Sequence, residues 1–260
     1  MVGIIIGLKV SVAMIQKVVK EIRKLLLLNK SNLTEEQMNR MYKIINPDNT
    51  NYEIYGIRVA IIDKIVKTVS DNFECNYNDA VEIFKELIRS NVEEEKFSGF
   101  LFLNRFNKFF NQNTIKLFHD ELLENCHTWS VLDSSCIRVL GPFLAKKGNE
   151  ALVKQTINEW ANSKNFWIKR GSMVLLLKII MVRKEFDKEY VYNLVEKMLE
   201  FANENYIEKG IGWLLKTCSK YNPDLIYEYL MENRNRFTRL ILRYASEKLV
   251  KEKRAVILKK

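Results

Sequence analysis

The sequence of 260 residues contains only 3 prolines and 9 glycines, while apolar residues recur along most of it at intervals of three and four. Proline and glycine are the residues that most often interrupt a helix, and the three-and-four spacing places apolar side chains on one helix face. Alternation of apolar and polar residues, which is typical of strands, is nearly absent. The sequence therefore predicts an all-α fold.

Local chemistry marks two of the expected helix starts. The stretch Thr34-Glu35-Glu36-Gln37 has the pattern of a capping box, and Pro223 follows Asn222 at a position that suits a first helical turn. The expected helices cover residues 12–28, 34–45, 58–69, 77–90, 93–110, 114–125, 133–146, 149–162, 166–183, 188–204, 206–220, 224–233 and 238–251.

Helix pairs recur along the chain at roughly 35 to 45 residues, which is the period of HEAT-like repeats. Stacked pairs of this kind form a solenoid whose concave face is an extended binding surface. Because no long Pro-, Gly- or Ser-rich linker interrupts the pattern, we expect a single domain over residues 1–260, with residues 1–30 as an N-terminal lead-in helix. A generic helical bundle would also account for this periodicity.

The charge balance indicates a polyanionic partner. The chain has 42 Lys and Arg against 32 Asp and Glu, a formal net charge of +10. Such an excess attracts nucleic acid or an anionic membrane surface. Many basic residues lie near expected helix ends, so the concave face is predicted to be basic. These residues are Lys146, Lys147, Lys154, Lys164, Lys169, Arg170, Lys216, Lys220, Arg234, Arg236, Arg239 and Arg243.

Cysteine spacing and the N-terminal segment indicate an intracellular protein. The four cysteines contain no C-x-x-C pair, so they predict reduced thiols rather than a disulfide framework or a zinc ribbon. The apolar start MVGIIIGLKVSVAMI is broken by Lys9 and is shorter than the ~20 residues of a spanning helix. We therefore expect a cytoplasmic location with the genomic DNA and no membrane partner.

The stretch ENCHTWSVLDSSC places Trp129 and Asp133 four residues apart. On a helix this spacing brings both side chains to one face. A π-face and a carboxylate both attract cations, so the pair is a candidate site for a positive charge. The alternative interpretation is a packed tryptophan above Asp133 as the N-cap of the helix that follows.

Two later segments share this combination of aromatic and charged residues. In NFWIKRGSMVLLL, Arg170 follows Trp167 by three positions, and NYIEKGIGWLLK contains Trp213. Together the patterns W-x-x-x-D, N-x-W-x-x-R and I-x-K-x-I-G-W-x-L resemble the DNA alkylation repair family of HEAT-like repeat proteins, the AlkD-type alkylpurine DNA glycosylases. The resemblance extends upstream to residues 40–43, 55–58 and 93–106, and so covers nearly all of the chain.

This resemblance implies a role for each matched residue. Trp129 and Trp213 correspond to two aromatic walls of the family's site, Asp133 to its catalytic carboxylate and Tyr42 to a further aromatic of the cleft. Arg170 corresponds to a phosphate-binding arginine. Lys216 stands where the family usually has an arginine, and Lys216 and Lys169 complete the predicted phosphate-binding set. Trp160 and Trp167 lie outside the matched positions and are expected to pack in the core.

The function implied is hydrolysis of the N-glycosidic bond of positively charged N3- and N7-alkylpurines, such as 3-methyladenine and 7-methylguanine, in base excision repair. The expected partner is double-stranded DNA that contains these lesions, and the expected enzyme is a monomer that uses no cofactor and no metal. The chain contains no glycine-rich phosphate loop, and His119 and His127 do not form a zinc spacing with its cysteines. Two alternatives remain open: a non-catalytic binder of damaged or branched DNA, and a protein–protein scaffold.

Overall fold

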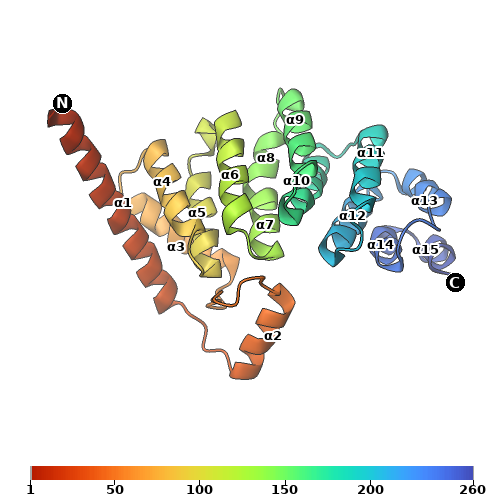
Figure 1. Cartoon of the computed structure of the whole chain (residues 1–260), viewed down its shortest axis with the longest axis horizontal. Helices are drawn as coiled ribbons and strands as arrows, with labels where there is room; N and C mark the ends of the chain where they lie inside the picture. Colours follow the sequence, from red (N-terminus) through yellow and green to blue (C-terminus); the bar gives the residue numbers. More distant parts are fainter. Residues whose placement is uncertain (1, 260) are drawn as a thin grey trace. The chain divides into compact units, whose positions relative to one another are not determined.

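The computed structural model describes residues 2–259, with side chains from residue 12 onward. Every regular element in that range is a helix (Figure 1), and the one isolated β-bridge there pairs Glu53 with Val92. This confirms the predicted all-α fold. Of the predicted lead-in helix, residue 1 lies outside the described residues. No helix in the described part of the chain combines the length and the apolar character that crossing a membrane would need.

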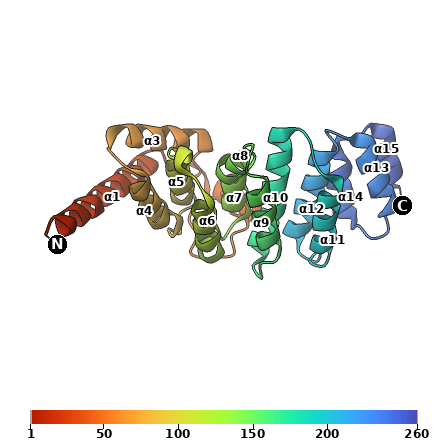
Figure 2. The same cartoon turned by 90° about the horizontal axis from the view of Figure 1, so that it is seen from above.

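The chain divides into two compact units, residues 1–139 and 140–260, and each is described by itself. In the first unit α4 packs along α5, α1 packs against α3, α4 and α5, and α5 contacts α7 (Figure 2). The helices of this unit are α1 (Val2–Leu28), α2 (Glu35–Ile45), α3 (Val59–Asn72), α4 (Tyr77–Ile88), α5 (Glu93–Asn104), α6 (Gln112–Asn125) and α7 (Trp129–Ser135), with a 3-10 turn at Asn107–Phe109.

Apolar stripes form the core of the first unit. Val18, Ile22 and Leu26 lie on one face of α1 and are completely buried, and the rings of Phe84 and Phe118 stack at 4.7 Å between α4 and α6. Fully burying one such side chain contributes ~1.5–3 kcal/mol. These contacts stabilise the packed helices of the first unit, of which α5 contacts α7.

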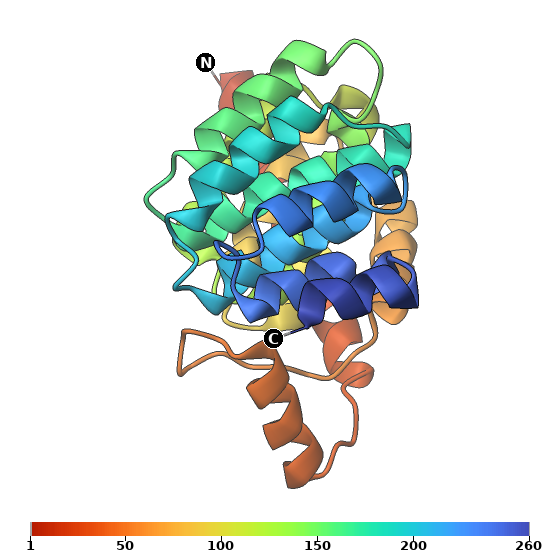
Figure 3. The same ribbon diagram turned by 90° about the vertical axis from the view of Figure 1, so that its right-hand side faces the viewer.

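One helix of the first unit lies outside this core. Figures 1 and 3 show α2, drawn in orange, projecting from the other helices of its unit. The predicted capping box is present, with Thr34 Oγ1 accepting from the backbone N–H of Gln37 at 3.3 Å and Gln37 Oε1 accepting from that of Thr34 at 2.9 Å. None of the residues of α2 is buried. Its position therefore depends little on the burial of apolar side chains.

The second unit is built from helix pairs in two layers, which confirms the predicted helical repeat. One layer is formed by α10, α12 and α14, each in contact with the next, and α9, α11 and α13 form the other layer (Figures 1 and 3). The elements are α8 (Gly141–Leu144), α9 (Glu150–Ala161), α10 (Phe166–Arg183), α11 (Lys188–Leu199), α12 (Asn205–Cys218), α13 (Pro223–Glu232), α14 (Arg239–Ala245), a 3-10 turn at Ser246–Lys248 and α15 (Lys251–Leu258).

Three predicted helices are subdivided in the structure. The one expected over 93–110 ends its α-helical part at Asn104 and is followed by the 3-10 turn at Asn107–Phe109. The one expected over 238–251 ends its α-helical part at Ala245, and α15 follows after a 3-10 turn. The one expected over 133–146 begins earlier, at Trp129, and contains a π-helical turn at Cys136–Leu140. Pro142 follows this turn. Its ring would clash with the backbone carbonyl four residues earlier, and proline has no N–H to donate to that carbonyl. The wider π turn fits a chain that cannot form the regular bond at that point.

Candidate functional site

Helix α7 carries the two residues that first suggested a cation site. Its N-cap is Thr128, whose Oγ1 accepts from the backbone N–H of Val131 at 3.2 Å. Trp129 is thus the first and Asp133 the fifth residue of one helix, and the four-residue spacing places them on one face. The interpretation of Asp133 as the N-cap of the following helix is wrong, because the helix begins one turn before it. Asp133 is buried, at 6% exposed, and Trp129 is half-buried.

The edge of the Trp129 ring is oriented by helix α2. Its indole Nε1–H donates to the backbone carbonyl of Ile44 at 3.1 Å, in the last turn of α2. The carbonyls of a last helical turn lack partners within their own helix, so this donor satisfies one of them. Because an indole N–H lies in the plane of the ring, the bond does not engage the π-faces.

Tyr42 lies in α2 and is half-exposed. Its hydroxyl donates to the backbone carbonyl of Tyr52 at 3.1 Å. A second link follows α2, where His127 Nδ1 lies 2.8 Å from Asp48 Oδ1 and the Asp48 backbone N–H donates to the His127 carbonyl at 3.1 Å. The structure therefore brings the end of α2, which carries Tyr42, to the start of α7, which carries Trp129.

Beneath the start of α7 lies a buried carboxylate that sequence reasoning missed. Glu93, the first residue of α5, accepts hydrogen bonds from the hydroxyls of Tyr52, Thr128 and Ser130. Burial is the largest influence on this carboxyl and raises its pKa, although bonds from Ser130 and Tyr52 oppose that effect. The available signal was the run Glu93-Glu94-Glu95, which by itself looks like ordinary acidic residues at a helix start.

The other two acids of this run make different contacts. Glu94 accepts from the backbone N–H groups of Tyr55 at 2.9 Å and Ile57 at 3.0 Å, and so fixes the segment before α3. Glu95 pairs with Arg23 of α1 at 2.9 Å. All three glutamates are buried, and only Glu93 contacts the start of α7 among the bonds described.

In the second unit Arg170 is the fifth residue of α10, the same position that Asp133 has in α7. Arg170 is buried, and its Nη1 donates to the backbone carbonyl of Tyr206 at the start of α12. Gly210 lies one turn further along α12, and a Cβ there would be 2.6 Å from Met173 Cε and 3.6 Å from Arg170 Nη1. Glycine at 210 thus leaves room for the side chains of α10.

Lys169, also predicted to bind phosphate, is engaged in contacts within the protein. Lys169 is buried, its Nζ donates to the carbonyl of Ala161 at 3.3 Å, and it lies 3.8 Å from the ring centre of Phe201. Burial lowers its pKa. Lys96 has the equivalent place in α5, where its Nζ donates to the carbonyls of Ile88 and Asn125. In both cases the ammonium group binds the C-terminal end of the preceding helix, and Lys96 also binds that of α6. Such helix ends attract cations.

Trp213 and Lys216 are half-buried on α12. The ammonium group of Lys216 pairs with Glu247 at 3.1 Å, and this hydrogen bond lowers the pKa of Glu247. Trp213 follows Gly212, where a Cβ would be 2.5 Å from Tyr244 Cβ. The close approach of α12 and α14 thus fixes the helix that presents Trp213 and Lys216.

The two other tryptophans and the second histidine have structural surroundings. Trp160 and Trp167 are each 1% exposed, as expected of core residues. His119 lies beside Asp120 at 3.1 Å. Among the described residues no group of three or more His, Cys, Asp or Glu side chains is arranged to hold a metal ion.

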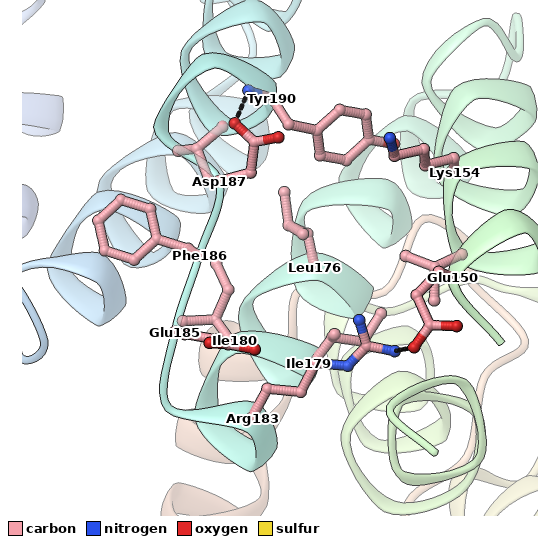
Figure 4. Close-up of a pocket in the computed structure, with 12 residues that line it drawn as sticks. Glu150, Lys154, Leu176, Ile179, Ile180, Arg183, Glu185, Phe186, Asp187 and Tyr190 are labelled. Atoms are coloured by element: carbon pink, nitrogen blue, oxygen red, sulfur yellow. Dashed lines mark hydrogen bonds and ion pairs between the residues drawn. The ribbon is translucent and has the colours of Figure 1, made fainter. Parts of the chain in front are cut away.

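A pocket of about 390 Å³ lies in the second unit among α9, α10 and the start of α11 (Figure 4). Leu176 and neighbouring apolar side chains line it, with charged groups at the rim. Arg183 pairs with Glu150 at 3.6 Å, and Asp187 accepts from the backbone N–H of Tyr190 at 3.2 Å. None of the predicted site residues lines this pocket.

Comparisons with known proteins agree with the observed fold. A solved structure described as a predicted DNA alkylation repair enzyme from Enterococcus faecalis superposes with a TM-score of 0.68 at 17% sequence identity, covering 84% of this chain and 97% of that one. No curated protein sequence matches the chain significantly. The family model for DNA alkylation repair enzymes matches residues 22–249, most of the chain, which supports a role in DNA alkylation repair with DNA as the partner. The chain therefore belongs to the DNA alkylation repair enzyme family.

Proposed function

We propose that this protein is a DNA glycosylase that removes positively charged N3- and N7-alkylpurines from double-stranded DNA in base excision repair. The observation that carries the proposal is the placement of Trp129 and Asp133 on one face of α7, with Thr128 rather than Asp133 as the helix cap. Asp133 is thus not required to cap α7, and it lies one turn beyond an aromatic residue on the same helix face.

The chemistry of the lesion explains the residue types. A purine alkylated at N3 or N7 carries a positive charge, and departure of the base leaves positive charge on the deoxyribose. In the proposed reaction Asp133 faces the sugar, stabilises its oxocarbenium-like charge and orients or deprotonates the attacking water, as carboxylates do in glycoside hydrolysis. Trp129 offers a π-face to the cation, worth ~0.5–2 kcal/mol. Because the base already leaves as a neutral molecule, the reaction needs no general acid and no cofactor.

The groups of the second unit are assigned to DNA binding. Following the family resemblance, Arg170 contacts a phosphate that flanks the lesion and Trp213 supplies a second aromatic face. Lys216 is assigned a weaker phosphate contact, because lysine is a point charge and cannot grip phosphate with a bidentate fork. Lys169 is left out, since its ammonium group binds the end of α9. The net charge of +10 predicts that binding to duplex DNA weakens steeply with salt.

The test is release of 7-methylguanine from methylated duplex DNA under single-turnover conditions. We expect the wild type to release the base, and Asp133→Asn to slow release by about 10²–10³-fold, because removing one electrostatic group at a reacting centre has effects of that size. Binding to methylated duplex should change little. The matched control is Asp120→Asn, which removes an exposed carboxylate of α6 that pairs with Lys116 at 2.8 Å.

Other outcomes would assign the protein differently. Salt-dependent duplex binding without base release by the wild type would favour the non-catalytic binder of damaged or branched DNA. Failure to bind DNA at low salt would favour a protein–protein scaffold. Equal rates for Asp133→Asn and Asp120→Asn would refute the role given to Asp133.

A further inference from the structure

The carboxylate of Glu93 is placed where it controls the start of α7. It is 4% exposed and lies at the first position of α5. Its Oε2 accepts from Tyr52 and, at 3.2 Å, from Thr128, while its Oε1 accepts from Ser130. Thr128 and Ser130 are the two residues that flank Trp129. One carboxylate thus holds the chain on both sides of the proposed aromatic wall.

The same bonds continue into the helix. Thr128 Oγ1 donates to Glu93 and also accepts from the Val131 N–H, so the group that caps α7 is itself held in place. Trp129 is held at its other edge by Ile44. Asp133 lies one turn beyond this fixed start, so a rotation or fraying of the first turn would move its carboxylate directly.

The network is suited to an ionised carboxylate rather than to a neutral group. A protonated carboxyl must donate one hydrogen bond, whereas three hydroxyl donors converge on Glu93. The start of α5 carries partial positive charge, and the ammonium group of Lys96 lies one turn further on. Burial nevertheless opposes this charge, so the ionised form lowers the stability of the fold. A cost of this kind is typical of functional positions.

We propose that Glu93 is a positioning residue for the Trp129–Asp133 pair: its carboxylate fixes the first turn of α7 and thereby the direction in which ring and carboxylate point. This inference rests on the proposed glycosylase function for its consequence in catalysis. Its structural part concerns only the orientation of Trp129 and is testable separately.

The experiment compares the wild type with Glu93→Gln and with Glu95→Gln, all labelled with 5-fluorotryptophan. Glutamine keeps the size of the side chain and removes the charge. Glu95 is the matched control, because it is a buried glutamate of the same turn that pairs with Arg23 instead of α7. The readouts are the fluorine resonance of Trp129, assigned with Trp129→Phe, the single-turnover rate of 7-methylguanine release, the affinity for duplex DNA and the melting temperature.

Glu93→Gln should shift or broaden the Trp129 resonance and slow base release by about 10- to 100-fold, since small misplacements of reacting groups have effects of that order. Its DNA affinity should be unchanged, and its melting temperature equal to or above that of the wild type. Glu95→Gln should leave the resonance and the rate unchanged. If Glu93→Gln fails to fold, Ser130→Ala replaces it, and it should shift the same resonance by removing one donor.

An unchanged Trp129 resonance together with an unchanged rate in a folded Glu93→Gln would overturn the inference and leave the glycosylase proposal intact. A wild type that releases no base would instead refute the glycosylase proposal. In that case the fluorine resonance alone decides the positioning role: a shift confined to Glu93→Gln supports it, and no shift overturns it.

Discussion

Replacing Trp129 by phenylalanine should loosen helix α2. None of the residues of α2 is buried, so the apolar packing that holds most helices in place contributes little here. Its C-terminal end is instead held by hydrogen bonds, among them the bond from the Trp129 indole to Ile44 and the bond from Tyr42 to Tyr52. Phenylalanine keeps an aromatic ring at position 129 but has no N–H to donate.

The size of the effect follows from the loss of that one bond. A neutral hydrogen bond contributes ~0.5–1.5 kcal/mol net, and the Ile44 carbonyl can find water once α2 has moved away. A loss of ~1 kcal/mol increases the population of the detached state about fivefold. Amide hydrogen exchange in α2 should accelerate by the same factor, while the buried amides of α4 and α5 should keep their rates.

The assay is hydrogen exchange followed by mass spectrometry or NMR, with peptides or amides resolved over residues 35–45. Trp213→Phe is the control, because Trp213 belongs to the second unit and makes no described bond to α2. Equal exchange of α2 in Trp129→Phe and in the wild type would refute the reasoning. It would mean that the other contacts of α2 hold it without help from the indole.

Three further predictions concern packing, charge and DNA binding. Gly212→Ala should lower stability by ~1–3 kcal/mol in chemical denaturation, because its Cβ would meet Tyr244 Cβ at 2.5 Å, and Gly210→Ala should cost less because the flexible end of Met173 can move. Burial lowers the pKa of Lys96 to about 8, so the folded state releases its proton before the unfolded chain does. From pH 7 to pH 9 the free energy of unfolding of the wild type should therefore rise by ~1 kcal/mol relative to that of Lys96→Met. If the two proteins differ in denaturation midpoint by the same amount at both pH values, this prediction is contradicted. Glu247→Gln should free Lys216 from its ion pair, so that Lys216 can neutralise one more phosphate. The slope of log affinity for DNA against log salt concentration should then become steeper by about one, as titrations at several salt concentrations would show.

Features that depend on neighbouring residues could be predicted from the sequence, and features that depend on distant residues could not. The capping box at Thr34 and the proline at the start of α13 are local, and both predictions are confirmed. Asp133 is followed by two serines and resembles a helix cap more closely than Thr128 does, so the sequence alone misplaces the cap. The contacts of Glu93 join residues 35 to 41 positions apart, and no periodicity reports such contacts.

The charged residues show the same limit. Lys169 and Lys216 both appeared in a basic set, but only the fold shows that one is buried against a helix end and the other pairs with a glutamate. The amphipathic pattern of α2 predicted a helix correctly and said nothing about its lack of burial. The roles given to Asp133, Trp129, Trp213, Arg170 and Tyr42 stay predictions until base release is measured.

The π turn at Cys136–Leu140 makes the direction of Trp129 and Asp133 tolerant of a change in chain length. A π turn holds one residue more than the α-helical turn it replaces, and each completes about one rotation of the helix. Deleting one residue there would therefore leave both side chains on the same helix face. It would instead bring the ring of Pro142 against the carbonyl four residues before it, at a cost of ~3 kcal/mol or more. A single codon lost in this segment would thus be felt in the stability of the fold, while the pair kept its direction.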